Sequence, residues 1–129
     1  MPSPITVLAV DDRAVFLRAT RELIAATPGF RQVGEAASGA EALELAADLH
    51  PDLVLLDVHM PGMDGVETAR RLIESDPRTV VVLVSLDELP KHAPCATLRK
   101  QELSTRALRQ VWDVHGRHVP SHDGAGADR

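Results

Sequence analysis

Aromatic residues are scarce in this sequence of 129 residues: they make up only 2% of it, and tyrosine is absent. Hydrophobic residues nevertheless account for 44% of the chain, which is enough for one core. That core must therefore be built from aliphatic side chains. The length predicts a single domain.

Disulfides and an excess of positive charge are also lacking. Cys95 is the only cysteine, so no disulfide can form within the chain, and a reducing compartment is expected. The 19 acidic and 14 basic residues give a net charge of -5, which argues against an electrostatically driven nucleic-acid surface. The N-terminus has no signal-peptide pattern, and no apolar run approaches a membrane span. We therefore expect a cytoplasmic protein with neither nucleic acid nor membrane as a direct partner.

Short apolar runs alternate with amphipathic segments along the chain. A continuous apolar run bounded by turn signals is typical of a buried strand, whereas apolar residues three and four apart indicate a helix. In the first helix, we expect Phe16, Ala19, Leu23 and Ala26 to face inward. The predicted strands are 5–10, 30–36, 53–57, 79–85 and 96–99, and the predicted helices are 13–27, 39–50, 64–76 and 104–115.

This alternation predicts an α/β fold, a doubly wound five-stranded parallel sheet with helices on both faces. The helical pattern weakens between Leu86 and Thr97, where Pro90 and Pro94 allow at most a short helix. The fold is therefore expected to have a shortened or missing fourth helix. We expect the domain to occupy residues 1–115, and residues 116–129 to form a disordered tail or the start of a linker.

Acidic residues follow two of the predicted strands. Asp11 and Asp12 come directly after the first apolar run, and Asp57 ends the central one. Open α/β sheets place their ligand sites at the carboxyl ends of the strands, so these side chains are predicted to converge. Clustered carboxylates repel each other unless a cation compensates them. Mg²⁺, with Mn²⁺ as an alternative, is the expected ion, because hard divalent cations prefer oxygen ligands.

Two further residues suit a phosphoryl group at this edge. Ser85 ends the fourth predicted strand and supplies a hydroxyl, while Lys100 follows the fifth and supplies a positive charge. An aspartate carboxylate can act as a nucleophile and form an acyl phosphate. Asp57 is therefore a candidate phosphoacceptor.

These residues, in this order and on these elements, resemble the receiver domain of two-component response regulators, which has the flavodoxin/CheY-like fold. The resemblance runs from Ile5 to His115 and includes the segment from Met60 to Gly65. It implies Mg²⁺-dependent phosphorylation of Asp57 by a sensor histidine kinase or a phosphotransfer protein. The phosphoryl group would then switch a partner surface or a homodimer surface, and the domain would dephosphorylate itself without being a turnover enzyme.

The resemblance also implies a role for each residue of the site. Asp12 would bind the metal directly and Asp11 mostly through water, with Asp57 and the main-chain carbonyl of His59 as further ligands. Ser85 would move towards the phosphoryl group, and Lys100 would pair with it.

The sequence departs from that family between Ser85 and Lys100. Fifteen positions separate the two residues, about seven fewer than usual, or two helical turns. Thr97 stands where many members have an aromatic residue, and Gln101 stands where proline is common. A cis bond before a non-proline residue costs about 2.5–4 kcal/mol, so the Lys100–Gln101 bond is expected to be trans.

Two alternatives stay open. A phosphorylation-independent pseudo-receiver, which would bind partners without switching, is favoured by the short segment before Lys100 and opposed by the complete acidic site. A phosphatase or phosphotransferase with an Asp nucleophile usually needs a second carboxylate as general acid, but position 59 is His.

His59 and Asp87, each two residues past a site residue, are expected to tune the lifetime of an acyl phosphate.

Overall fold

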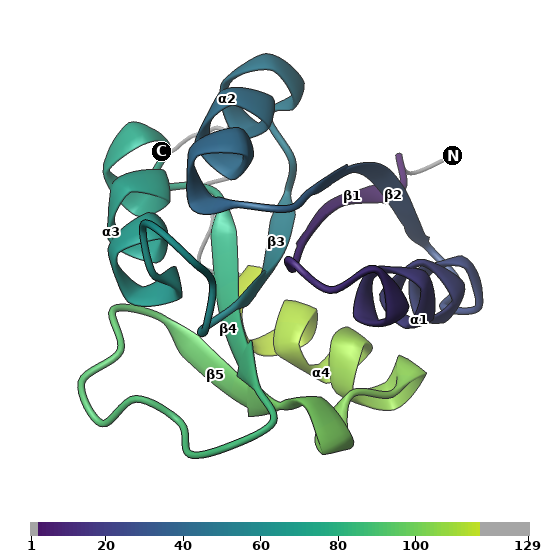
Figure 1. Cartoon of the computed structure of the whole chain (residues 1–129). Helices are drawn as coiled ribbons and strands as arrows, with labels where there is room; N and C mark the ends of the chain where they lie inside the picture. The colour runs from purple at the N-terminus through teal and green to yellow at the C-terminus, as the bar shows by residue number, and fades with distance from the viewer. Residues whose placement is uncertain (1–2, 117–129) are drawn as a thin grey trace.

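A five-stranded parallel sheet forms the centre of the computed structural model, which describes residues 3–116 (Figure 1). The strand order is β2-β1-β3-β4-β5, so the chain runs first to one edge of the sheet and then to the other. The prediction of a five-stranded parallel sheet is confirmed. The predicted tail, apart from Gly116, lies outside the described residues. The strands are β1 (Ile5–Val10), β2 (Phe30–Ala36), β3 (Leu53–Asp57), β4 (Val80–Ser85) and β5 (Ala96–Arg99).

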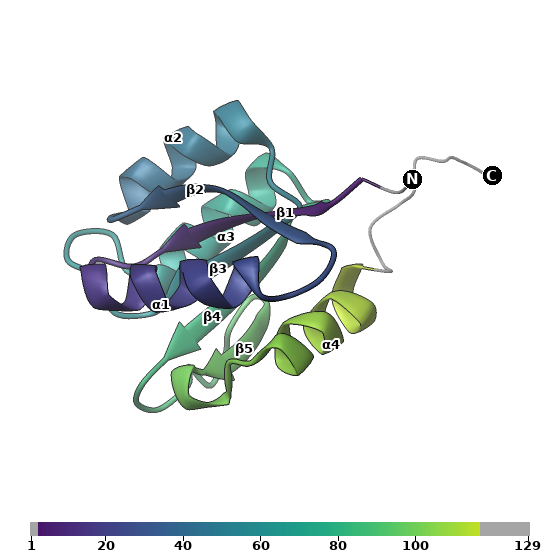
Figure 2. The same ribbon diagram turned by 90° about the vertical axis from the view of Figure 1, so that its right-hand side faces the viewer.

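Helices cover both faces of the sheet (Figure 2). α2 (Gly39–Leu49) and α3 (Gly65–Ser75) lie on one face, over a core that includes Leu8, Val54 and Leu83. α1 (Ala14–Ala25) and α4 (Thr105–His115) lie on the other, where Ile24 and Leu108 are fully buried. Both cores are almost entirely aliphatic, as the composition required. The central strands are buried on both faces, as is typical of parallel sheets.

The inward face of α1 differs in part from the predicted one. Ile24 is the fully buried residue of this helix, whereas Ala19 and Ala26 are exposed. Phe16 and Leu23 do lie partly inside. The long side chain of Ile24 thus fills the core where two alanines were expected, because a larger apolar side chain gains more from burial.

No helix connects β4 to β5. Residues 86–95, all described by the structure, form an open loop that swings away from the sheet before the chain returns as the edge strand β5 (Figure 1). Ala93 and Cys95 from this loop pack against the core on the α2–α3 face. After β5, a short 3₁₀ turn, η1 (Lys100–Glu102), leads into α4. Among residues 3–116, no helix has both the length and the apolar character needed to cross a membrane.

Candidate functional site

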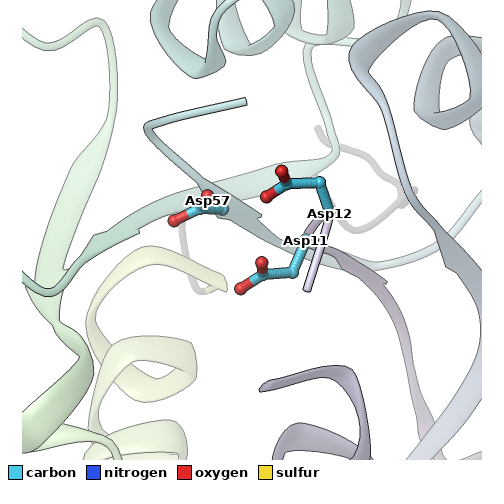
Figure 3. Close-up of side chains that lie close together, drawn as sticks. All are labelled: Asp11, Asp12 and Asp57. Atoms are coloured by element: carbon cyan, nitrogen blue, oxygen red, sulfur yellow. The ribbon is translucent and has the colours of Figure 1, made fainter. Parts of the chain in front are cut away.

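Three carboxylates converge at the carboxyl edge of the sheet. Asp57 ends β3, and Asp11 and Asp12 follow β1, its neighbour in the sheet (Figure 3). One oxygen from each of the three lies within 4.8 Å of the others. Asp11 and Asp57 are buried, whereas Asp12 is exposed. The sequence prediction that these residues would meet is therefore confirmed.

Backbone hydrogen bonds hold the two strand ends in register. The Asp11 amide donates to the Ala36 carbonyl at 3.0 Å, and the Val58 amide donates to the Val84 carbonyl at 3.0 Å. The ladder therefore continues up to each acidic residue, and the side chains are held by the sheet itself. Sites carried on rigid elements keep their geometry better than sites carried on loops.

Gly65 brings α3 against the end of β3. Its amide donates to the Val58 carbonyl at 2.9 Å, just past Asp57. A Cβ atom at this position would lie 2.4 Å from the main-chain oxygen of Asp57 and 2.7 Å from Cα of Val58. Both atoms belong to the backbone, so neither can swing aside. The close approach of helix and strand end therefore requires glycine here.

Gly65→Ala is expected to lower the free energy of unfolding by about 2 kcal/mol, because the added methyl group forces the backbone apart. Gly62→Ala is the matched control: Gly62 has a φ of 81°, but nothing lies within 4 Å of its Cβ position. Only the left-handed backbone opposes an alanine there, at about 1 kcal/mol. Urea unfolding of both variants measures the difference, and equal losses would show that the contact with Asp57 is unimportant.

Lys100 supplies the positive charge of the site. Its Nζ lies 2.6 Å from Oδ2 of Asp11 and 3.3 Å from Oδ1 of Asp57. The side chains of all three residues are at most 9% exposed. This lysine enters the site from η1, directly after the edge strand. One buried cation is thus shared between two buried carboxylates.

The pKa of the Asp57 carboxyl is raised above its usual value. Burial is the main cause, and the charge of nearby Asp11 adds to it. Lys100 opposes this rise through its charge and hydrogen bond, but does not cancel it. The folded protein therefore holds a proton on Asp57 more readily than the unfolded chain does.

The donor set fits a hard divalent cation. Two oxygens on one Mg²⁺ lie at most about 4.2 Å apart, since each is about 2.1 Å from the ion. The three carboxylates, within 4.8 Å, need only a small contraction or a bridging water. Three carboxylates also carry more negative charge than Lys100 alone offsets. The arrangement is typical of a Mg²⁺ site.

The remaining predicted residues lie at or just past the ends of β3, β4 and β5. Ser85 is fully buried at the end of β4, and its Oγ accepts a hydrogen bond from the Asp87 amide at 3.1 Å. His59 is exposed in the loop after β3 and lines the same hollow as Asp87. The Lys100–Gln101 bond is trans, as expected, because the described residues include no cis peptide. The Gln101 side chain donates to the Leu86 carbonyl at 3.1 Å, which ties η1 to the end of β4.

Sequence reasoning missed one neighbour of the site. The sequence assigned Phe16 only to the core face of the first helix. In the structure, Nζ of Lys100 lies 3.7 Å from the centroid of the Phe16 ring. The contact joins residues far apart in the sequence, so no spacing could have indicated it. The only available signal was that Phe16 lies close after Asp11-Asp12 in a chain with two phenylalanines.

Comparison with known proteins identifies the family. The profile of the response regulator receiver domain matches residues 7–98 of this chain. The chain belongs to the response regulator receiver domain family. The fold is accordingly CheY-like, and the cluster of Asp11, Asp12 and Asp57 is the acidic pocket of a receiver domain.

Individual relatives agree with this assignment. The chain is 40% identical over 101 residues to a protein-glutamate methylesterase/protein-glutamine glutaminase of Myxococcus xanthus, covering 78% of this chain and 29% of that protein. It is similar to the receiver domain of the putative response regulator NarL from Mycobacterium tuberculosis, with 30% identity and a TM-score of 0.77 over 88% of this chain and 98% of that one.

A third relative was solved with a metal ion. One chain of the CheX–CheY–BeF3–Mg²⁺ complex from Borrelia burgdorferi is 27% identical, with a TM-score of 0.74 over 87% of this chain and 90% of that one. The curated relatives are longer: this chain spans 29% of the Myxococcus protein and 38% of the nitrate/nitrite regulator NarL of Escherichia coli. The receiver is therefore only part of those proteins.

Proposed function

We propose that this receiver domain is switched by Mg²⁺-dependent phosphorylation of Asp57. One observation carries the proposal: a buried carboxylate at the end of the central strand, with two more carboxylates and one buried lysine around it. The family supports it, because receiver domains partner with histidine kinases. The phosphodonor would be a phosphohistidine on a sensor kinase or on a phosphotransfer protein.

The transfer balances as a simple displacement. An Oδ atom of Asp57 forms a bond to phosphorus while the bond between phosphorus and the donor histidine nitrogen breaks. That nitrogen keeps the electron pair and takes a proton from solvent. Bound Mg²⁺ would offset negative charge on the transferred group. Asp11, Asp12, Asp57 and the main-chain carbonyl of His59 are the proposed metal ligands.

Ser85 and Lys100 are the proposed responders. Phosphorylation adds charge and strong acceptor oxygens at Asp57. Lys100 already lies 3.3 Å from an Asp57 oxygen and can follow the new charge. Ser85 would exchange the Asp87 amide for a phosphoryl oxygen, which would pull on the start of the 86–95 loop. The change would reach a partner or a homodimer surface through this shortened connection between β4 and β5, which has lost the helix usual for the family.

The wider setting follows the family. We place the receiver domain at residues 1–115, whereas the predicted tail or start of a linker lies, apart from Gly116, outside the described residues. We also infer a cytoplasmic location, which the single cysteine supports. A domain that accepts a phosphoryl group and slowly loses it to water is not a turnover enzyme.

The test is the intact mass of the protein after incubation with Mg²⁺ and acetyl phosphate. We expect a gain of one phosphoryl group that is lost when EDTA removes the metal. A protein that gains no phosphate under these conditions contradicts the proposal. In that case the rival reading, a pseudo-receiver that binds partners without phosphorylation, takes its place, and the helix-free 86–95 segment is the observation that favours it.

His59 and Asp87 are expected to set the lifetime of the phosphorylated state. Both line one hollow together with Val58, the residue that follows Asp57, and we propose that the water that attacks the acyl phosphate approaches from this hollow. His59→Asn and Asp87→Ala should each change the rate of dephosphorylation by more than about twofold, since ordering or blocking that water alters a proton transfer. The rate is measured as loss of the added mass after the donor is removed. His92→Asn, an exposed histidine farther along the loop, is the control, and a change confined to that variant would count against the assignment.

A further inference from the structure

Both phenylalanines of this chain pack against a cation. Nζ of Lys100 lies 3.7 Å from the centroid of the Phe16 ring, and the guanidinium carbon of Arg13 lies 5.8 Å from the same centroid. The guanidinium carbon of Arg109 lies 5.1 Å from the centroid of Phe30. The two rings occupy different places: Phe16 is beside the acidic site, while Phe30 begins β2 at the opposite end of the sheet. Only the first can influence the chemistry at Asp57.

Lys100 and a metal ion compete for Asp11. Oδ1 of Asp11 accepts a hydrogen bond from the Arg13 amide at 3.0 Å, and Oδ2 is 2.6 Å from Nζ of Lys100. Each oxygen therefore already accepts one bond, although a carboxylate oxygen can accept a second. The contact from Lys100 to Asp57 is longer, at 3.3 Å. A cation that uses Asp11, directly or through water, is repelled by the nearby ammonium and binds more weakly while Lys100 keeps its shorter contact.

The Phe16 ring favours the position in which Lys100 contacts Asp11. An ammonium over the face of an aromatic ring is attracted by the ring, and the attraction grows when water is excluded. The lysine side chain is only 9% exposed here. Beside it lies a cavity of about 240 Å³ whose walls are mostly apolar, with Leu17, Leu55 and Leu103 among them. Apart from Asp11, the lining of this cavity offers the ammonium no charged partner.

We propose that Phe16 is a positioning residue: its ring holds Lys100 on Asp11 and so weakens metal binding by the unphosphorylated receiver. Many members of this family carry an aromatic residue on the fifth strand, where this chain has Thr97. Here an aromatic contact to the site comes instead from the first helix. The inference rests on the proposed function, because it presumes that the acidic cluster binds Mg²⁺.

The experiment is an amide NMR titration of the unphosphorylated protein with MgCl₂. Phe16→Leu removes the ring but keeps an apolar side chain, and the dissociation constant for Mg²⁺ is expected to fall roughly threefold to tenfold. Phe16→Tyr keeps a ring and should bind Mg²⁺ as the unmodified protein does. Phe30→Leu, which removes the other phenylalanine from beneath a cation, should leave the constant unchanged.

A Lys100→Met background separates positioning from a general structural effect. Without the ammonium, the cation left over the Phe16 ring is the more distant Arg13 guanidinium, at 5.8 Å, so the effect of Phe16→Leu should shrink to less than about twofold if it acts through Lys100. The role of Phe16 is overturned if Phe16→Leu leaves the dissociation constant for Mg²⁺ unchanged when Lys100 is present. It is also overturned if Phe16→Leu lowers that constant just as much in the Lys100→Met background. An unmodified protein that binds no Mg²⁺ overturns the proposed function as well, so the two failures are distinguishable.

Discussion

Asp57→Asn is expected to abolish the uptake of phosphate from acetyl phosphate. An amide oxygen is a far weaker nucleophile than a carboxylate and does not form the acyl phosphate. Asp11 cannot readily substitute, because both of its oxygens are engaged by Arg13 and Lys100. The intact mass of the variant should therefore not change in the presence of Mg²⁺ and the donor.

Asp64→Asn is the matched control for this result. Asp64 caps the start of α3, where its Oδ1 accepts a hydrogen bond from the Glu67 amide at 2.9 Å. Asparagine caps helices about as well as aspartate, so the variant should fold and take up phosphate normally. If Asp57→Asn were still phosphorylated in stoichiometric amounts, the acceptor would have to be another residue.

Loss of phosphorylation in Asp57→Asn should not come from unfolding. Because the pKa of Asp57 is raised in the folded protein, the folded state binds its proton more tightly than the unfolded state. The stability that this proton provides is lost as the pH rises from the unfolded pKa through the folded one. At pH 7 the buried charge of the carboxylate therefore lowers the stability of the folded protein, and asparagine removes that charge. Urea unfolding should show a more stable variant at pH 7, with the advantage disappearing in acid.

Lys100→Met is expected to cost about 3 kcal/mol of stability when no divalent ion is present. Removing one partner of a buried ion pair leaves its counterpart buried and uncompensated. Here two counterparts are left, since Lys100 contacts both Asp11 and Asp57. The loss is measured by urea unfolding in EDTA at pH 7.

Saturating Mg²⁺ should return much of that loss, because an ion that binds only the folded state stabilises it. The added stability should be larger in Lys100→Met than in the unmodified protein, where the lysine already offsets the carboxylates. Lys91→Met is the control: Lys91 is the only other lysine of the sequence and is exposed in the 86–95 loop. An equal response to Mg²⁺ in all three proteins would mean that the lysine and the ion do not share a site.

The sheet was predictable because its strands have strong local signals. The apolar runs ending at Val10, Asp57 and Ser85 are continuous, and each is followed by turn residues. The acidic cluster followed from them, since parallel strands bring their carboxyl ends to one edge. The weak edge strand at Ala96–Arg99 was also found.

The contacts across the sheet were not predictable in the same way. Which residues of α1 face inward depends on which side chains the sheet can accommodate. Two stripes of apolar residues overlap on this helix, and they are offset by only one position. The η1 turn is too short to leave a periodic pattern. Lys100 pairs with Asp11 as well as with Asp57, and it also contacts Phe16. These contacts depend on differences of a fraction of an ångström in the positions of the strand ends.

The helix-free loop between β4 and β5 has a thermodynamic consequence. Residues 86–95 contain a turn at Lys91 and His92 but no helix or strand, so few of their amides are held by backbone hydrogen bonds. Amides without such bonds exchange their hydrogens with water readily, which indicates a low free energy of local opening. A partner that binds this segment must restrict it at a cost of about 1–2 kcal/mol per residue. Its affinity will therefore depend on how much of the loop the phosphorylated domain has already immobilised.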